Sequence, residues 1–360
     1  YEVLHGGRFD LATFAQSYLE YKSGQLSIKA GRQIFESFLT ASNDTKMIPN
    51  TFEGIALHSR DIPFLSVKAA YLTRQKLRDH ESFHHLLAYG DDPTVPGANW
   101  DENDDSAMHQ GLTLSKLQAE GIDDRLAVFE ATYTPAPQLE LMFNYTAVPQ
   151  LIASATVNGI YRFDLANGIN LVPSIRYMHQ MDKGAGKIGG ANLAANTIGY
   201  DDPNSLDGGL FGAKIDLVQG AWDVGLGYTR VWDEGDLIAP WRKFPTSGYT
   251  RLMGQYNIYA GTKTIAIDSK YDFGETGLAS GLKVRAGYAI QNFDDTKPGV
   301  QADSNAFTIH LIKTYESIPN LSTKIGMGFV EGRDDTIAMD GSLKHDSSYR
   351  DLRFEINYLF

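Results

Sequence analysis

The sequence predicts an all-β protein, a transmembrane antiparallel β-barrel, and three observations lead to this expectation. Apolar and polar residues alternate along many short segments, which is the two-residue period of a strand with one apolar and one polar face. Short turns and long connections alternate between these segments. The chain contains 35 Gly, 19 Tyr and 18 Phe, a composition that suits tight turns, strands and aromatic girdles.

Length and composition exclude several other classes of protein. The 360 residues contain no apolar run near the ~18 residues that a membrane-spanning helix needs. Cysteine is absent, which excludes disulfides, Cys-ligated metals and a Cys nucleophile. The net charge of -12 argues against nucleic acid as a partner.

About fifteen segments carry the strand pattern. The last of them shows it best, because Leu352, Phe354 and Ile356 would face one side of a strand. Arg353 and Glu355 would face the other side. The expected strands lie at residues 10–22, 25–34, 51–60, 63–75, 125–135, 137–147, 151–163, 169–180, 209–219, 221–231, 263–273, 281–292, 305–315, 321–331 and 348–360.

The connections between these strands predict two different rims. Short turns are expected near residues 23–24, 61–62, 135–137, 166–168, 219–220, 275–280 and 317–320. Long connections are expected at residues 35–50, 76–124, 181–208, 232–262, 293–304 and 332–347, and the one at 148–150 is a short exception. Periplasmic turns and extracellular loops give a bacterial outer-membrane barrel this asymmetry. We therefore expect an integral protein of the bacterial outer membrane.

The polar faces of the strands are expected to enclose water. In lipid the sheet must close, because unpaired backbone groups cost several kcal/mol each there. A closed antiparallel barrel with both termini at the periplasmic rim needs an even number of strands. We therefore expect residues 1–360 to form a single barrel domain that lacks an odd number of N-terminal strands, most simply three, of about eighteen.

Charged residues on the inward faces are the candidates for solute binding. A row of cations on a low-dielectric wall attracts anions and offers them successive weak sites. The alternative is that these cations only pair with Asp216, Asp268, Asp272 and Glu355 in a polar lumen. The expected pore-lining residues are Lys283, Arg285, Lys324, Arg353, Lys270, Asp268, Arg176 and Lys214, and Lys29, Lys68 and Arg162 share the inward face.

No motif indicates a metal, a cofactor or a catalytic site. His80, His84 and His85 lie in the longest loop without the spacing of a metal motif, and we interpret them as surface histidines. The acidic run at residues 101–105 lacks EF-hand spacing and is interpreted as solvated surface charge. The glycine-rich stretch at 184–189 lies in a loop, where a dinucleotide fingerprint has no meaning. We expect a protein that is not an enzyme.

The segment Asn43-Asp44-Thr45-Lys46-Met47-Ile48-Pro49-Asn50-Thr51-Phe52-Glu53-Gly54 resembles the constriction-loop motif of the OprD family of outer-membrane porins. The stretches at 26–32, 60–63, 254–257 and 352–358 continue the likeness. The resemblance implies about eighteen strands, a pore narrowed by folded-in loops and a ladder of basic side chains. It also implies constriction-loop roles for Asn43, Asp44, Thr45, Pro49, Tyr256 and Asn257.

This resemblance implies passive, partly selective diffusion of small hydrophilic solutes, with carboxylate-bearing nutrients such as organic acids or amino acids as the expected class. The expected partners are the solute and the lipid and lipopolysaccharide of the outer membrane, and the expected state is a monomer or a loose trimer. One departure is that Lys324 is followed by glycines where a denser basic row is expected. The alternatives are an outer-membrane barrel enzyme and a transporter of hydrophobic substrates.

Overall fold

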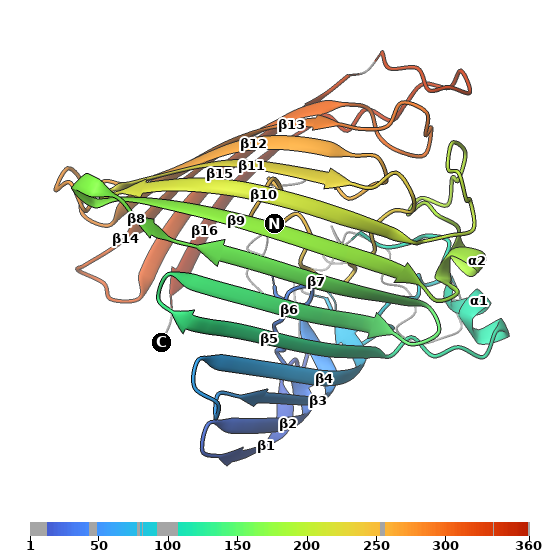
Figure 1. The fold of residues 1–360 in the computed structure, drawn as a ribbon, viewed down its shortest axis with the longest axis horizontal. Helices are drawn as coiled ribbons and strands as arrows, with labels where there is room; N and C mark the ends of the chain where they lie inside the picture. Colours follow the sequence, from blue (N-terminus) through green and yellow to red (C-terminus); the bar gives the residue numbers. More distant parts are fainter. Residues whose placement is uncertain are drawn as a thin grey trace.

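The structure is a computed structural model that describes residues 13–42, 49–77, 80, 82–91, 107–252, 256–333 and 335–358. Its strands join in one antiparallel sheet, which curves into the wall of a barrel (Figure 1). The strands are β1 (Ser17–Ser23), β2 (Leu26–Gln33), β3 (Thr51–Ser59), β4 (Leu65–Lys76), β5 (Leu126–Ala136), β6 (Leu139–Val148), β7 (Ile152–Tyr161), β8 (Phe163–Asp164), β9 (Ile169–Asp182), β10 (Gly208–Gln219), β11 (Trp222–Val231), β12 (Lys263–Asp272), β13 (Leu282–Asn292), β14 (Ser304–Thr314), β15 (Leu321–Gly332) and β16 (Tyr349–Tyr358).

Each strand pairs with its neighbour in the chain, and only the two-residue β8 lies off this path, against β9. The expected antiparallel fold is confirmed, and the fifteen expected strands correspond to the fifteen strands of the path. Short turns gather at one rim and the longer connections at the other, with the short helices α1 (Leu114–Ala119) and α2 (Ala185–Gly189) among the latter (Figure 1). Among the described residues, no helix is both long and apolar enough to cross a bilayer.

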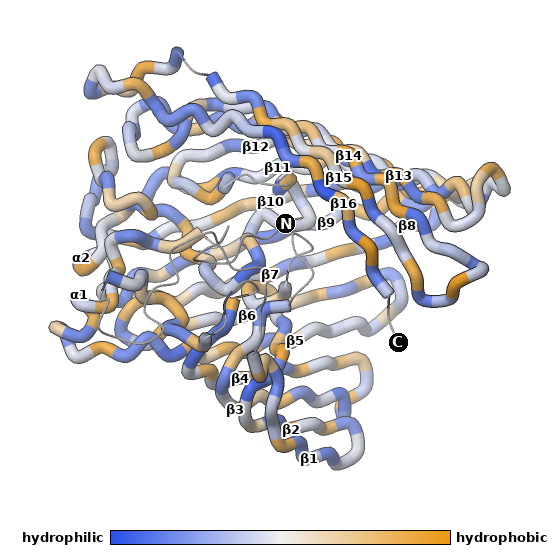
Figure 2. Tube along the Cα trace, turned by 180° about the vertical axis from the view of Figure 1, so that it is seen from behind, coloured by the Kyte–Doolittle hydropathy of each residue, from blue (hydrophilic) through white to orange (hydrophobic). Residues whose placement is uncertain are grey.

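The outward face of the sheet is apolar and uncovered. Hydrophobic and hydrophilic residues alternate along the strands (Figure 2). On β16, for example, Leu352 is 73% and Phe354 66% exposed, whereas Arg353 and Glu355 turn inward and are partly buried. Outward aromatic rings cluster near the rim of short turns, as in the contact between Trp222 and Tyr271, whose centroids lie 4.5 Å apart. An apolar belt with such a girdle suits lipid.

The longer connections fold inward and build a core of their own. Phe38 and Leu39 from the β2–β3 connection join Trp241 and Phe244 from the β11–β12 connection in one buried cluster. The inward residues of several strands near that rim, such as Leu72, complete the cluster. The alternation along the strands did not indicate this second core, because the residues that form most of it lie in connections without periodicity. Side chains of the connections therefore fill much of the interior toward the long-loop rim.

The histidines of the β4–β5 connection differ from the expectation. His84 is 1% exposed, so it is not a surface residue. Its backbone pairs with that of Gln75 at the end of β4. His85 is partly exposed, and its Nδ1 lies 2.9 Å from Oδ1 of the buried Asp124. The described residues 82–91 of this connection are therefore fastened to the barrel.

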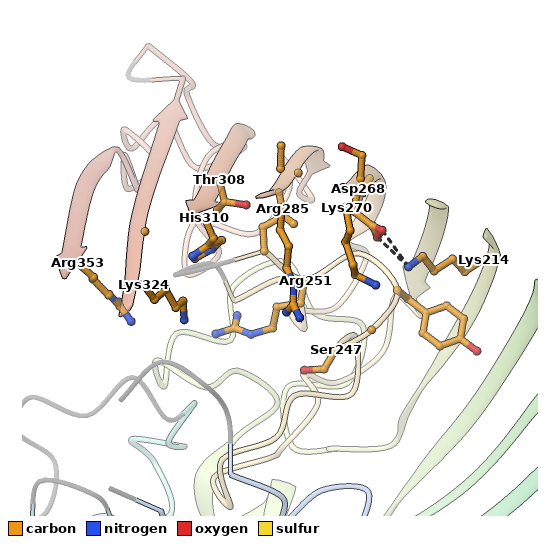
Figure 3. Close-up of a pocket in the computed structure, with 18 of the residues that line it drawn as sticks. Lys214, Ser247, Arg251, Asp268, Lys270, Arg285, Thr308, His310, Lys324 and Arg353 are labelled. Carbon is orange, nitrogen blue, oxygen red and sulfur yellow. Dashed lines mark hydrogen bonds and ion pairs between the residues drawn. The ribbon is translucent and has the colours of Figure 1, made fainter. Parts of the chain in front are cut away.

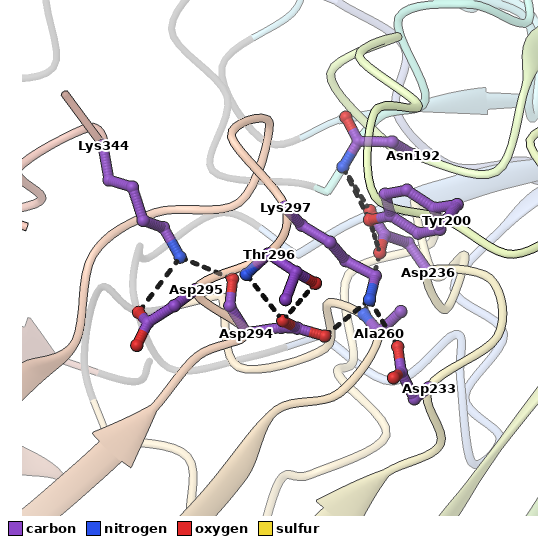
Figure 4. Close-up of polar contacts among 10 residues, drawn as sticks. All are labelled: Asn192, Tyr200, Asp233, Asp236, Ala260, Asp294, Asp295, Thr296, Lys297 and Lys344. Carbon is purple, nitrogen blue, oxygen red and sulfur yellow. Dashed lines mark hydrogen bonds and ion pairs between the residues drawn. The ribbon is translucent and has the colours of Figure 1, made fainter. Parts of the chain in front are cut away.

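A polar network joins the long connections to one another (Figure 4). Buried Asp236 accepts hydrogen bonds from the Tyr200 hydroxyl (2.6 Å), the Asn192 amide (2.9 Å) and the backbone N–H groups of Leu193 and Ala260. Lys297, whose side chain is 2% exposed, forms ion pairs with Asp233 and Asp294. The loops that leave β9, β11 and β13 are thus held together.

Candidate functional site: the narrowed pore

A cavity of about 500 Å³ lies between the inward-folded β11–β12 connection and the inner wall formed by β10 to β16. Its lining is strongly cationic, since seven Lys or Arg residues and His310 face only two acidic residues among the residues that line it. The basic residues are Lys214, Lys243, Arg251, Lys270, Arg285, Lys324 and Arg353, and the acidic ones are Asp268 and Glu355.

The sheet register places the wall residues in a row. Lys270 of β12 lies opposite Arg285 of β13, and Arg285 lies opposite His310 of β14. Gly326 of β15 lies opposite both His310 and Arg353 of β16. The row therefore crosses five neighbouring strands, and its side chains point into the cavity (Figure 3).

Most of these cations are paired with acids on the same wall. Lys214 lies 2.8 Å from both Asp216 and Asp268, and Lys270 lies 2.7 Å from Asp223. Lys324 lies 3.3 Å from Glu355, and Arg353 pairs with Asp351. Lys283, an expected pore-lining residue, is not among the residues that line the cavity and lies 2.8 Å from Asp272. The structure thus contains features of both alternatives from the sequence. A row of cations faces the lumen, as solute binding requires, and acids of the same wall neutralise much of that row.

Arg285 differs from its neighbours in the row. Within the described part of the chain its guanidinium has neither an ion pair nor a hydrogen bond, and it lines the cavity. A guanidinium presents five N–H donors that suit a carboxylate bidentately. Arg285 is therefore the wall residue best able to bind an anion from solution.

Inward-facing glycines make room for this arrangement. A Cβ atom on Gly326 would lie 2.8 Å from Nδ1 of His310, and one on Gly227 would lie 2.2 Å from the carbonyl oxygen of Tyr249. A Cβ on Gly287 would meet Leu252 at 2.9 Å. The glycines that interrupt the expected basic row therefore leave room for the side chain of His310 and for the β11–β12 connection.

Arg176 is placed as an anchor of the β11–β12 connection. Its Nη1 donates to the carbonyl oxygens of Pro245 (2.7 Å) and Ser247 (2.8 Å). Its guanidinium carbon lies 4.3 Å from the ring centroid of Tyr249 and 4.7 Å from that of Phe38. Phe38 belongs to the other inward connection, so one buried arginine contacts both.

Glu130 holds the β2–β3 connection in a similar way. Its Oε2 accepts hydrogen bonds from the Phe38 backbone N–H (2.6 Å) and the Asn144 amide (3.2 Å). Its Oε1 pairs with Lys68 at 3.2 Å, and Lys68 also donates to the Glu36 carbonyl oxygen. The cation expected at Lys68 thus fixes a loop. The other two inward candidates lie apart from the cavity, with Lys29 over the Tyr18 ring and Arg162 at the turn rim.

Two cavity cations escaped the sequence interpretation because they lie in a connection. Lys243 donates its backbone N–H to the carbonyl oxygen of Leu39 at 3.1 Å, which joins the two inward connections beside the cavity. Burial and the positive charge of Arg176 lower the pKa of Lys243. Arg251 lies over the Phe244 ring at 3.4 Å. In the sequence, only the constriction-loop roles that the family resemblance implied for Tyr256 and Asn257 pointed to this region.

The residues expected in the constriction loops are dispersed. Asn43, Asp44 and Thr45 lie outside the described residues, whereas Pro49 precedes Asn50, whose N–H donates to Ser42 at the cavity edge. Tyr256 stacks on Phe244 with ring centroids 5.4 Å apart. Asn257 is buried and donates to the hydroxyls of Thr250 and Thr264, so it braces the connection without lining the cavity.

The comparisons with known proteins agree with this architecture. A family model described as outer membrane porin, OprD family, matches residues 13–304. The chain belongs to the OprD family of outer-membrane porins. The resemblance in the sequence is thereby confirmed, and the porin is an integral outer-membrane β-barrel with a channel for small solutes.

Solved structures from Pseudomonas aeruginosa share the porin's fold. OpdK, solved with vanillate, is 16% identical with a TM-score of 0.72, and the match covers 95% of this chain and 77% of that one. OpdQ is 16% identical with a TM-score of 0.71 and coverages of 95% and 80%. OpdO is 19% identical with a TM-score of 0.68 and coverages of 95% and 78%. No protein of curated function matches the porin's sequence at a significant level.

Proposed function

We propose that this porin passes small solutes that carry a carboxylate, and that Arg285 is the central binding group of its pore. The observation that carries the proposal is the guanidinium of Arg285, which has neither an ion pair nor a hydrogen bond among the described residues. It lies in the middle of a cationic row, within a cavity of about 500 Å³. The solute bound in the similar OpdK, vanillate, is itself a carboxylate. Transport by diffusion, without catalysis, is part of the proposal.

The route would use both sides of the cavity. Arg285 and the other cations of the row lie on the wall, and Lys243 and Arg251 approach from the inward connection. A carboxylate between the two sides would exchange one cation for the next, which permits binding that is weak enough for release. The pairs of Lys214, Lys270 and Lys324 with acids keep the row from holding an anion too tightly.

Swelling of liposomes that contain the porin tests the proposal. Benzoate should enter faster than benzamide, a neutral solute of the same size, and Arg285→Gln should remove most of the difference. As a control, Arg162→Gln removes a charge at the turn rim, away from the cavity. Equal rates for benzoate and benzamide in the unaltered porin would refute the proposed selectivity.

We also propose that each chain encloses its own pore, whether the porin is a monomer or a loose trimer. The cationic row that lines the cavity runs over the neighbouring strands β12 to β16 of one continuous sheet. Chemical cross-linking would give the number of chains in an assembly. Step closures of single channels would show whether conductance falls by one unit for each chain.

A further inference from the structure

Two cations lie opposite each other on the lipid-facing side of the β11–β12 hairpin. Arg230 is the last residue but one of β11, Lys263 is the first of β12, and the register pairs them directly. Both are exposed, and within the described part of the chain neither side chain forms an ion pair or a hydrogen bond. Like charges directly opposite each other destabilise a sheet, and a bound anion would relieve the repulsion between Arg230 and Lys263.

An apolar furrow begins at the next outward pair of the same hairpin, Tyr228 opposite Ile265. It has a volume of about 700 Å³ and is lined almost wholly by apolar side chains. The register continues it across the wall from Tyr228 to Ala213, Ile175 and Gly159. The furrow is hollow because Ala213 and Gly159 are small and stand in line with large neighbours.

We propose that Arg230, Lys263 and this furrow bind the phosphorylated, acylated lipid anchor of lipopolysaccharide. The two cations would bind a phosphate of the head group and the furrow would accommodate an acyl chain. One site would therefore bind both the charged and the apolar part of the same lipid. The proposal rests on the outer-membrane location that the family establishes. It does not depend on carboxylate selectivity, because Arg230, Lys263 and the large apolar side chains of the furrow face outward from the barrel.

The position of the site agrees with this lipid and not with a lipid of the inner leaflet. Arg230 and Lys263 lie where the hairpin enters the long β11–β12 connection, at the rim of long loops, which is extracellular in an outer-membrane barrel. Nearby Trp232 lies 5.6 Å from Tyr177 between ring centroids, an aromatic pair of the kind found at a membrane interface. Because strands in such barrels tilt by roughly 35–45°, a furrow across them descends obliquely from the head group into the membrane.

Among the described residues, two polar side chains near the pair, those of Asp233 and Asn292, have partners of their own. Asp233 follows Arg230 in the chain, but its carboxylate is bound to Nζ of the buried Lys297. Asn292, the residue opposite Lys263 on β13, donates its amide to Asp303 instead of presenting a charge. A phosphate would therefore meet two cations without competition from either residue.

Lipid binding to the purified porin in detergent tests the proposal. Dissociation constants are measured for bisphosphorylated hexa-acylated lipid A, for phosphatidylglycerol and for inorganic phosphate. R230Q/K263Q should weaken the binding of lipid A by at least about tenfold, since each basic residue near a membrane surface contributes appreciably to anionic lipid binding. K313Q is the matched control, because Lys313 faces outward near the opposite rim, and it should leave the affinity unchanged.

A second variant tests the furrow independently of charge. In G159V the new Cβ would lie 3.6 Å from Leu141 and 3.7 Å from Ile175, which are ordinary contacts, so the strand tolerates the change while the furrow is partly filled. This variant should weaken lipid A binding severalfold and leave the weak binding of inorganic phosphate unaltered. Equal affinity of R230Q/K263Q and the unaltered porin for lipid A would overturn the proposal. Phosphatidylglycerol binding as tight as lipid A binding would do so as well.

Discussion

Replacing Arg176 by Gln should widen the pore. The substitution removes two hydrogen bonds from a charged group to the carbonyl oxygens of Pro245 and Ser247, and two ring contacts, with Phe38 and Tyr249. Hydrogen bonds to charged groups contribute roughly 1.5–3 kcal/mol each, so the inward connection would lose about 3 kcal/mol or more of anchoring. That loss raises the population of the detached connection by more than about a hundredfold.

Single-channel recording measures this effect. The R176Q channel should show a higher mean conductance and larger current noise than the unaltered porin. R285Q is the matched control, since it removes the same charge from the same wall, and Arg285 has no hydrogen bond to the described part of a connection. It should keep the conductance and lose preference for carboxylates. A decrease in anion preference at unchanged conductance in R176Q would refute the anchoring role and make Arg176 a binding group.

Four further outcomes are expected. Gly227→Ala should raise the conductance and its noise, because a Cβ would lie 2.2 Å from the Tyr249 carbonyl oxygen and displace the connection; a channel indistinguishable from the unaltered one would contradict this. Leu226→Arg, on the outward face, should lower the free energy of unfolding in lipid by ~2–4 kcal/mol, as measured in denaturant titrations, whereas an unchanged midpoint would place Leu226 away from lipid. Because the pKa of Lys243 is lowered by burial, anion preference should decline with rising pH before an ordinary lysine titrates, and Lys243→Met should abolish that decline in reversal potentials. Burial alone would raise the pKa of Asp294, but hydrogen bonds from Lys297 and Thr296 lower it to about 2. The ionised Asp294 therefore stabilises the loops fully above pH 3.8, its ordinary pKa, and this stabilisation is lost as the pH falls toward 2. Proteolysis of the loops should accordingly increase only in that acid range.

The strands could be predicted from the sequence because each one separates lipid from water. The expected strand at 169–180 corresponds to Ile169–Asp182, and the one at 281–292 to Leu282–Asn292. A shift of one residue would turn the charged side of either strand toward lipid, so the residue pattern alone sets the face. The same pattern placed Arg285 and Arg353 on the inner wall.

The pore interior could be predicted only in part. Whether an inward cation binds solute, pairs with an acid or anchors a loop depends on residues far away in the chain. The contact of Glu130 with Phe38 joins residues 92 positions apart, and Arg176 reaches Pro245 over 69 positions. Lys243 and Arg251 lie in a connection that has no periodicity to reveal them. Contacts between a strand and a connection far away in the sequence can be identified only from the three-dimensional structure.

The reversal potential of a single porin channel in a gradient of potassium benzoate tests the central claim most directly. A wet lumen with a cationic wall and an available Arg285 predicts a steady conductance whose reversal potential shows preference for benzoate over potassium. A channel selective for potassium, or a reconstituted protein that conducts no ions, would contradict the account.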